Sequence, residues 1–308
     1  MRLALVGPTA SGKTRAAISL AERIGQVELM SMDSMAVYRG MDIGTAKPSP
    51  EELAGTPMHL LDLVDPWEEF TLREFQGAAF EALEDIAGRG SHAFMVGGTG
   101  LYLHAVVDRL DLPERFPVVA ALLQEQADLP GGLPRLYDRL VEADPIAASR
   151  IQPGNRRRII RALEVTLGSG RPFSSYGPGV ATFPPTDVVM VGIRFDPSVH
   201  DPLIEERFGQ MMKSGLLEEV RRLAGTEGGM SRTARQALGY RELLAHIEDG
   251  VPLAEASSRA VDRTRAFARR QWAWFRRDPR ITWMDPASDV PGFISELLAD
   301  RIGAASGC

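Results

Sequence analysis

A glycine-rich segment near the start of the sequence has the residue types and spacing of a phosphate-binding loop. It matches the pattern G-x-x-x-x-G-K-[ST] and consists of Gly7, Pro8, Thr9, Ala10, Ser11, Gly12, Lys13 and Thr14. Its glycines let backbone N–H groups surround phosphate oxygens, and a helix that starts here adds the positive end of its dipole. Lys13 would add a charge and the Thr14 hydroxyl would bind Mg²⁺. We expect a phosphate ligand, rather than a glycine turn that binds nothing.

The loop alone does not say whose phosphates it binds, and ATP is the ordinary ligand of such a loop. A typical nucleotide hydrolase or kinase places an acid for Mg²⁺ at the end of a later apolar strand. Here the apolar run 93–96 leads instead into Gly97-Gly98-Thr99-Gly100, whereas Asp33 follows the earlier run 27–32. This departure argues against an ATPase and leaves ATP as the alternative ligand.

The elements that would position these residues are short apolar strands alternating with helices. Apolar runs cover residues 2–7, 27–32, 93–96 and 188–195, and the first is followed by a segment with helical spacing. Such alternation predicts a parallel α/β sheet with ligands at the carboxyl edge of its strands. Residues 201–277 have helical periodicity, and residues 281–283 would add a final edge strand.

A middle segment lacks the strand pattern and is bracketed by Leu112-Pro113 and Gly177-Pro178-Gly179. Its pattern is typical of helices and it is rich in arginine. We therefore expect a core formed by residues 1–112 and 180–308, with a helical insertion at residues 113–179.

Composition limits the class of protein and the kind of metal. The 308 residues include 44% apolar and 25% charged residues, which is enough for a sizeable core. No run approaches the roughly 18 apolar residues of a membrane span, and the first apolar run is too short for a signal peptide, so we expect a cytosolic protein. One cysteine, Cys308, excludes an internal disulfide, and five scattered histidines offer no transition-metal spacing. Any metal should be a hard, oxygen-bound ion.

The net charge of −6 conceals two arginine clusters, at residues 150–161 and 259–280. Affinity for phosphates depends on where cations lie and not on their sum, so both clusters are candidate RNA-binding faces. For the second cluster, a solvated helix face is an equal alternative. Lysine occurs only as Lys13, Lys47 and Lys213, which makes each retained lysine informative.

Six segments resemble, in order, the signatures of bacterial tRNA dimethylallyltransferases, and the likeness covers nearly the whole chain. They are the phosphate loop; Asp33-Ser34-Met35-Ala36-Val37-Tyr38-Arg39-Gly40-Met41-Asp42-Ile43-Gly44-Thr45-Ala46-Lys47-Pro48; Val96-Gly97-Gly98-Thr99-Gly100-Leu101-Tyr102; Arg156 to Val165; Gln236 to Glu242; and Arg269-Arg270-Gln271 with Trp274-Phe275-Arg276-Arg277.

The resemblance implies both a fold and a reaction. The fold is an α/β P-loop NTPase-like parallel sheet flanked by helices, with a helical insertion that grips the tRNA anticodon stem-loop. The phosphate loop would bind dimethylallyl diphosphate, with Mg²⁺ on Thr14. The prenyl group would pass to N6 of the adenosine 3′-adjacent to the anticodon, a base that must leave its stack to react. We expect a cytoplasmic monomer without membrane association.

The resemblance also implies catalytic roles. Adenine N6 is a weak nucleophile because its lone pair is delocalised, and Asp33 would act as its general base. The alternative for Asp33 is the N-cap of a following helix. Thr99 would face the reacting centre, unless it is merely a turn residue. Arg207 would join Lys13 in stabilising the leaving diphosphate; without the resemblance it would be a surface arginine paired with nearby glutamates.

Two segments, 156–160 and 236–241, resemble tRNA-contacting segments of the family, and further contacts are expected around Asp33 and at Thr99. The expected contacts are Asp33, Ser34, Met35, Ala36, Thr99, Arg156, Arg157, Arg158, Ile159, Ile160, Gln236, Ala237, Leu238, Gly239, Tyr240 and Arg241. The arginines would bind backbone phosphates and supply affinity rather than sequence choice. Gln236 stands where some relatives carry arginine. For the aromatic group Trp272, Trp274, Phe275 and Trp283, we expect core packing rather than stacking on bases.

Three rival functions remain. A small-molecule kinase would use ATP on the same loop, but it needs an acid-terminated strand and no basic insertion. An enzyme that prenylates free adenine nucleotides would not need the arginines of residues 150–161. A non-enzymatic RNA-binding module would leave the phosphate loop and Asp33 without a role.

Overall fold

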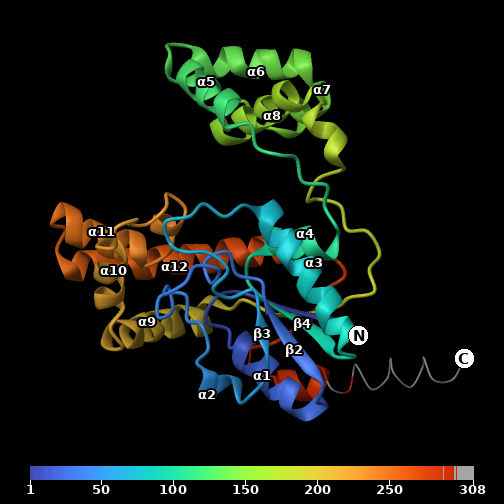
Figure 1. Cartoon of the computed structure of the whole chain (residues 1–308), viewed down its shortest axis with the longest axis vertical. Coiled ribbons are helices and arrows are strands. Elements are labelled where there is room, and N and C mark those ends of the chain that lie inside the picture. The colour runs from blue at the N-terminus through green and yellow to red at the C-terminus, as the bar shows by residue number, and fades with distance from the viewer. Residues whose placement is uncertain (287, 295, 297–308) are drawn as a thin grey trace, which may run out of the picture. The chain divides into compact units, whose positions relative to one another are not determined.

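The structure is a computed structural model that describes residues 1–286, 288–294 and 296, so Cys308 lies outside the described residues. The chain divides into two compact units (Figure 1). The first comprises Met1–Val107 and Pro185–Cys308, and the second comprises Asp108–Pro184. The segment 113–179, expected as an insertion, lies inside the second unit.

The first unit contains a six-stranded sheet in the order β3-β2-β4-β1-β5-β6, and every pairing is parallel. The strands are β1 (Arg2–Val6), β2 (Val27–Ser31), β3 (Met58–His59), β4 (His92–Gly97), β5 (Val189–Ile193) and β6 (Thr282–Met284). The expected parallel α/β sheet is confirmed, with β6 at one edge. The two-residue β3 was not expected, because it is too short to produce an alternating or apolar pattern.

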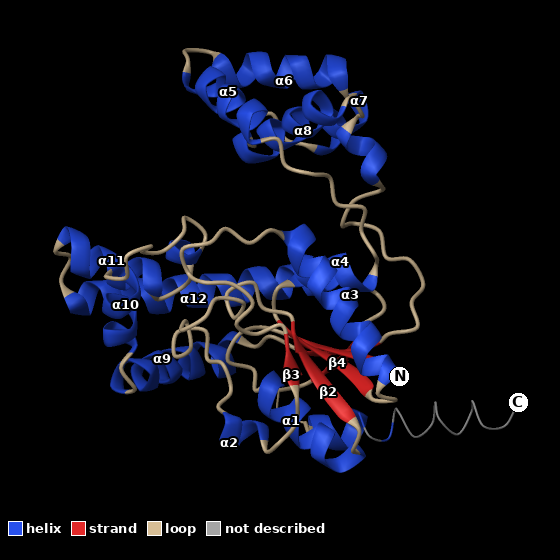
Figure 2. Ribbon diagram, in the orientation of Figure 1, coloured by secondary structure: helices blue, strands red, loops and turns tan. Residues whose placement is uncertain are grey.

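Helices cover both faces of the sheet, which explains why its strands are almost continuously apolar. In β1, Leu3 and Leu5 pack in the cluster that contains α1 (Lys13–Ile24). The alternate residue Ala4 packs in the cluster that contains α3 (Leu72–Gly88). Figure 2 shows β2, β3 and β4 side by side with these helices around them.

The first unit contains further helices. Among those with described bounds are the short α2 (Pro50–Leu53), α4 (Gly100–Val107), α9 (Pro197–Lys213), α10 (Leu216–Ala224), η2 (Ala234–Gln236), α11 (Tyr240–Asp249) and α12 (Leu253–Phe275). The helical periodicity at residues 201–277 is therefore confirmed. Phe275 is buried in the core, and Trp274 and Trp283 pack against it, as expected for the aromatic group.

The second unit is entirely helical in the described residues. It contains α5 (Pro117–Asp128), α6 (Gly132–Ala143), α7 (Pro145–Arg150), α8 (Arg156–Ser169) and η1 (Phe173–Tyr176). Its own core includes Leu123, Leu140 and Leu163. The Asp144 and Asn155 side chains cap α7 and α8 by accepting backbone N–H groups, which fixes where these helices begin. Across both units, none of the described helices is long and apolar enough to span a bilayer.

Candidate active site

The strand order places three loops with polar residues side by side. In the sheet β4 lies between β2 and β1, and the register pairs Ser31 with Val96 and Val6 with Gly97. The carboxyl ends of parallel strands meet at one edge, so the phosphate loop, the Asp33 segment and the Thr99 turn leave the sheet together.

The phosphate loop depends on glycine at both ends. Gly7 has φ +152°, and a Cβ there would lie 3.1 Å from the Ile193 carbonyl oxygen. Gly12 is left-handed at φ +78° and occupies the N-cap of α1. Lys13 follows it and donates to the Pro8 carbonyl oxygen and to Ser11 Oγ at 3.3 Å. These bonds hold the Lys13 side chain, which is only 9% exposed, inside the loop.

Three ionisable groups from separate elements act on one another here. Burial, with a smaller contribution from the Arg207 charge, lowers the pKa of Lys13 to about 7, and the Asp33 charge opposes both effects. Burial also lowers the pKa of Arg207, against the attraction of Asp33. The site thus combines two cationic side chains with one carboxylate, an arrangement that favours an anionic ligand.

Arg207 lies on α9 and is half-buried. Its neighbours on the helix have other partners: Glu205 pairs with Arg265 at 2.6 Å, and Glu206 accepts a hydrogen bond from Gln210 at 3.1 Å. The alternative of a surface arginine paired with nearby glutamates is therefore wrong.

Asp33 forms a tight turn and does not cap a helix. Its Oδ1 accepts the Met35 N–H at 2.8 Å, and no helix begins between residues 34 and 49, all of which the structure describes. The N-cap alternative is therefore wrong. The Thr99 N–H donates to the Met32 carbonyl oxygen at 3.2 Å, and Thr99 Oγ1 accepts the Ser34 N–H at 3.3 Å. Thr99 therefore holds the backbone on both sides of Asp33.

A residue that sequence reasoning did not assign joins two of these loops. Gln271 on α12 accepts the Thr9 N–H at 2.8 Å through Oε1 and donates to the Gly98 carbonyl oxygen at 3.0 Å through Nε2. The available signal in the sequence was the Arg-Arg-Gln motif, in which Gln271 is an uncharged amide in a helical segment rich in arginine. The structure shows that this amide is buried.

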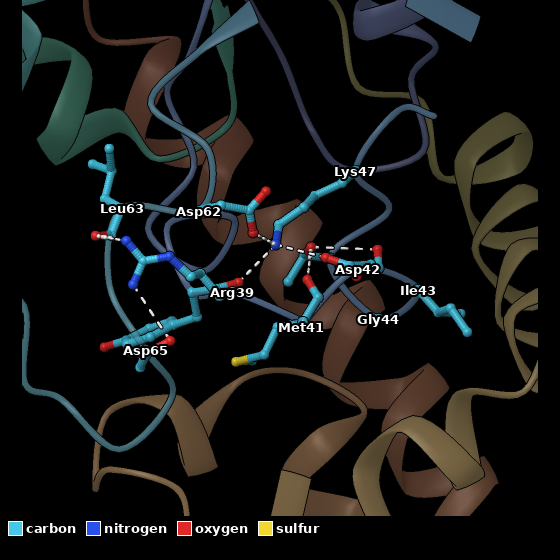
Figure 3. Close-up of polar contacts among 12 residues, drawn as sticks. Arg39, Met41, Asp42, Ile43, Gly44, Lys47, Asp62, Leu63 and Asp65 are labelled. Atoms are coloured by element: carbon cyan, nitrogen blue, oxygen red, sulfur yellow. Dashed lines mark hydrogen bonds and ion pairs between the residues drawn. The ribbon is translucent and has the colours of Figure 1, made fainter. Parts of the chain in front are cut away.

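The segment that follows Asp33 is held by the retained lysine of its motif. Lys47 Nζ donates to the Tyr38 carbonyl oxygen at 2.6 Å and pairs with Asp42 at 2.8 Å and Asp62 at 2.6 Å. Figure 3 shows its ammonium group between the two carboxylates. Arg39 donates to the Leu63 carbonyl oxygen at 2.9 Å. Lys47 therefore has a structural role, because it joins the segment that follows Asp33 to Asp62.

A second set of hydrogen bonds to this segment, also not predicted from the sequence, comes from Glu219 on α10. Glu219 is buried and accepts the N–H groups of Asp42, Ile43 and Gly44 at 3.0, 2.9 and 3.2 Å. It also accepts the Tyr240 hydroxyl, whose pKa is raised by burial and by the Glu219 charge, so Tyr240 stays a donor. An acid on the otherwise apolar face of α10 was the available signal.

Comparison with known proteins identifies the family. The family described as IPP transferase matches residues 36–278, and the family described as isopentenyl transferase matches residues 1–64. The chain belongs to the IPP transferase family.

Relatives of this IPP transferase match along most of their length. Proteins named tRNA dimethylallyltransferase from Desulforudis audaxviator and from Roseiflexus sp. are each 45% identical, over 91% and 98% of this chain and 90% and 99% of their own. A solved tRNA isopentenylpyrophosphate transferase from Bacillus halodurans superposes with a TM-score of 0.71 at 35% identity, covering 99% of this chain and 98% of its own. A eukaryotic dimethylallyltransferase described as acting on tRNA has a TM-score of 0.76 at 25% identity, covering 92% of this chain and 73% of its own.

The segment 236–241 of this IPP transferase exposes only some of the expected contact residues. Gln236 and Arg241 are exposed and line a groove of about 680 Å³ beside α11 and α12. Ala237 and Tyr240 are buried, so their side chains do not face solvent. Leu238 is half-buried and Gly239 is buried.

The arginines at the start of α8 differ in their availability. Arg156, Arg157 and Arg158 are all exposed, but Arg156 pairs with Asp128. Ile159 and Ile160 belong to the core of the second unit. Their side chains face inward, and only the exposed arginines of this segment present side chains to a partner.

Three arginines of α12 pair with acids, two on other helices and one in the first turn of α12 itself. Arg263 pairs with Glu242, Arg269 pairs with Asp201 at 2.6 Å, and Arg259 pairs with an acid four residues earlier. This pairing supports the alternative of a charge-balanced helix face for these arginines rather than an RNA-binding face.

Proposed function

We propose that this chain transfers the dimethylallyl group of dimethylallyl diphosphate to N6 of the adenosine 3′-adjacent to the anticodon in tRNA, releasing diphosphate. The observation that carries the proposal is the meeting of Lys13, Arg207 and Asp33 at one sheet edge. Its relatives are named tRNA dimethylallyltransferases, and that name fits a site with cations for a diphosphate and a carboxylate for a proton.

The reaction exchanges a C–O bond for a C–N bond. The N6 lone pair attacks C1 of the allyl group, the C1–O bond breaks, and diphosphate leaves with the bonding electrons. Asp33 accepts the N6 proton. Lys13 and Arg207 stabilise the negative charge that grows on the diphosphate oxygens. Thr99 keeps the Asp33 segment in place through its bonds to the flanking backbone.

Thr14 is the proposed protein ligand of Mg²⁺. Its half-buried hydroxyl follows Lys13 at the start of α1. In the described residues, no group of three or more His, Cys, Asp or Glu side chains could hold a metal ion. Mg²⁺ bound mainly by substrate phosphates and water needs no such group, so the residues present fit the ion. When bound, Mg²⁺ neutralises part of the diphosphate charge.

The acceptor is a tRNA anticodon stem-loop. Arg157 and Arg158 are exposed at the start of α8 and supply phosphate contacts from the second unit. Gln236 and Arg241 line the groove of the first unit and supply further polar contacts. The target adenosine leaves its stack, because N6 in a stacked loop cannot align with an allylic carbon.

One assay separates this function from its rivals. The protein is incubated with labelled dimethylallyl diphosphate, Mg²⁺ and either total tRNA or AMP, and the acceptor that gains label is identified. We expect label in tRNA and none in AMP, and no ATP requirement. Label in AMP would favour a cytokinin-forming enzyme, and ATP turnover stimulated by a small molecule would favour a kinase.

A further inference from the structure

The Gln271 side chain hydrogen-bonds both the phosphate loop and the turn that carries Thr99. It is 7% exposed and reaches both loops from α12, far from either in sequence. Its amide oxygen faces a backbone donor at Thr9, and its amide nitrogen faces a backbone acceptor at Gly98. Both halves of the amide are therefore used.

The Gln271 amide packs directly against the backbone of Gly98. A Cβ at residue 98 would lie 2.2 Å from Gln271 Nε2, so glycine is needed for the amide to approach. A Cβ at Gly97 would lie 2.3 Å from the Met32 carbonyl oxygen on the other side. The turn is thus packed between α12 and the end of β2, and it cannot move away from Gln271 without disrupting this packing.

The hydrogen bonds form one path from the diphosphate loop to the proposed base. Thr9 bonds Gln271, Gln271 bonds Gly98, and the adjacent Thr99 bonds the Ser34 N–H next to Asp33. Glutamine suits the link, because a carboxylate lacks the donor that the Gly98 carbonyl needs and an ammonium lacks the acceptor.

We infer that Gln271 is a positioning residue that sets the distance between the donor diphosphate and the acceptor nitrogen. The inference rests on the proposed function and deepens it. Gln271 touches neither substrate in this scheme; it acts through the loop that carries Lys13 and the turn that carries Thr99. A misplacement of about 1 Å between reacting groups can cost about 10²-fold in rate, so removal of this link should appear in kcat.

The test compares Gln271→Met, which fills the same volume without hydrogen bonds, with a matched control. Gln76 is a buried glutamine on α3 whose Nε2 donates to the Ala105 carbonyl oxygen at 2.6 Å, outside the three loops. Wild type, Gln271→Met and Gln76→Met are compared by kcat, KM for dimethylallyl diphosphate, tRNA dissociation constant and thermal midpoint. We expect Gln271→Met to lower kcat by about 10–100-fold with the tRNA dissociation constant unchanged. Gln76→Met should lower the thermal midpoint similarly but keep kcat within about twofold of wild type.

A third variant adds a readout that a purely structural role would not move. In Gln271→Glu, the protonated carboxylic acid can both donate to Gly98 and accept from Thr9, whereas the carboxylate can only accept. The ratio of its kcat to that of wild type should therefore rise as the pH falls from 8 to 6.

The outcomes separate the two proposals. Transfer to tRNA by wild type with near-normal kcat in Gln271→Met would overturn the inference and leave the proposed function standing. Equal losses of kcat in both methionine variants, or a Gln271→Glu ratio that does not change with pH, would also overturn it by assigning Gln271 a structural role. No transfer by wild type would remove the proposed function and this inference with it.

Discussion

Replacing Glu219 by glutamine should destabilise the protein far more than the removal of one charge suggests. The Glu219 carboxylate accepts from four donors: the N–H groups of Asp42, Ile43 and Gly44, and the Tyr240 hydroxyl. One oxygen faces two of these donors and the other faces the remaining two. A glutamine keeps one oxygen and turns an NH₂ group toward the other pair, whichever way the amide rotates.

Two donors of this largely part-buried cluster would then be left without an acceptor. Each such donor costs about 1–3 kcal/mol, so Glu219→Gln should lower the free energy of unfolding by about 2–6 kcal/mol. Because a typical domain has only about 5–15 kcal/mol of stability, this is a large fraction. The matched control is Glu218→Gln on the same helix, where the exposed Glu218 side chain lies 3.7 Å from Arg221. Its removal should change stability by less than about 0.5 kcal/mol.

Urea denaturation of both variants at pH 7 measures the difference. Hydrogen exchange of the N–H groups at residues 42–44 should accelerate in Glu219→Gln and stay slow in Glu218→Gln. Adding Tyr240→Phe removes one donor, so Glu219→Gln should cost less in that background by about 1 kcal/mol or more. Equal stabilities of the two glutamine variants, or additive effects with Tyr240→Phe, would refute the role proposed for the Glu219 carboxylate.

Three further outcomes follow from the site. Asp33→Asn keeps an oxygen for the turn but removes the base, so single-turnover transfer should fall by about 10²–10⁴-fold with the thermal midpoint unchanged; near-normal transfer would eliminate Asp33 as the base. Because the pKa of Lys13 is lowered to about 7, its cationic form dominates below pH 7 and is lost above it. Affinity for inorganic diphosphate, measured by calorimetry, should therefore weaken by up to about tenfold per pH unit above 7. In Lys13→Ala this slope should be shallower and KM for the prenyl donor higher, with tRNA affinity kept; an identical slope in both proteins would contradict the assignment. Replacing Arg157 and Arg158 by alanine should weaken tRNA binding and reduce its salt slope by about 0.7–0.9 log units for each phosphate that is no longer neutralised, and an unchanged slope would return both arginines to solvated helix residues.

Local pattern was sufficient for the phosphate loop and for every strand of the sheet except the two-residue β3. Strands buried on both faces need continuous apolar runs, and a loop that wraps phosphate needs glycine at fixed positions, so both leave a signal in neighbouring residues. Asp33 directly follows such a run and Thr99 follows another after two glycines, and the family resemblance assigned both to the reaction. Arg207 has no local signal, and only the family resemblance selected it before its half-buried position and its electrostatic effect on Lys13 were seen.

Tertiary structure decided which distant residues complete the site. Gln271 bonds a residue 262 positions away, and Glu219 holds N–H groups 175–177 positions away; no periodicity within a segment encodes such distances. It also decided between interpretations of single residues. The sequence allowed Asp33 to be a helix cap, and the structure excluded this role because no helix begins at residues 34–49. The pairing of the α12 arginines likewise became visible only in the folded chain, where α9 and α11 supply the acids. The sequence by itself determined which elements form, because secondary structure depends on neighbouring residues; the partners of buried polar groups depend on how those elements pack, which only the folded chain specifies.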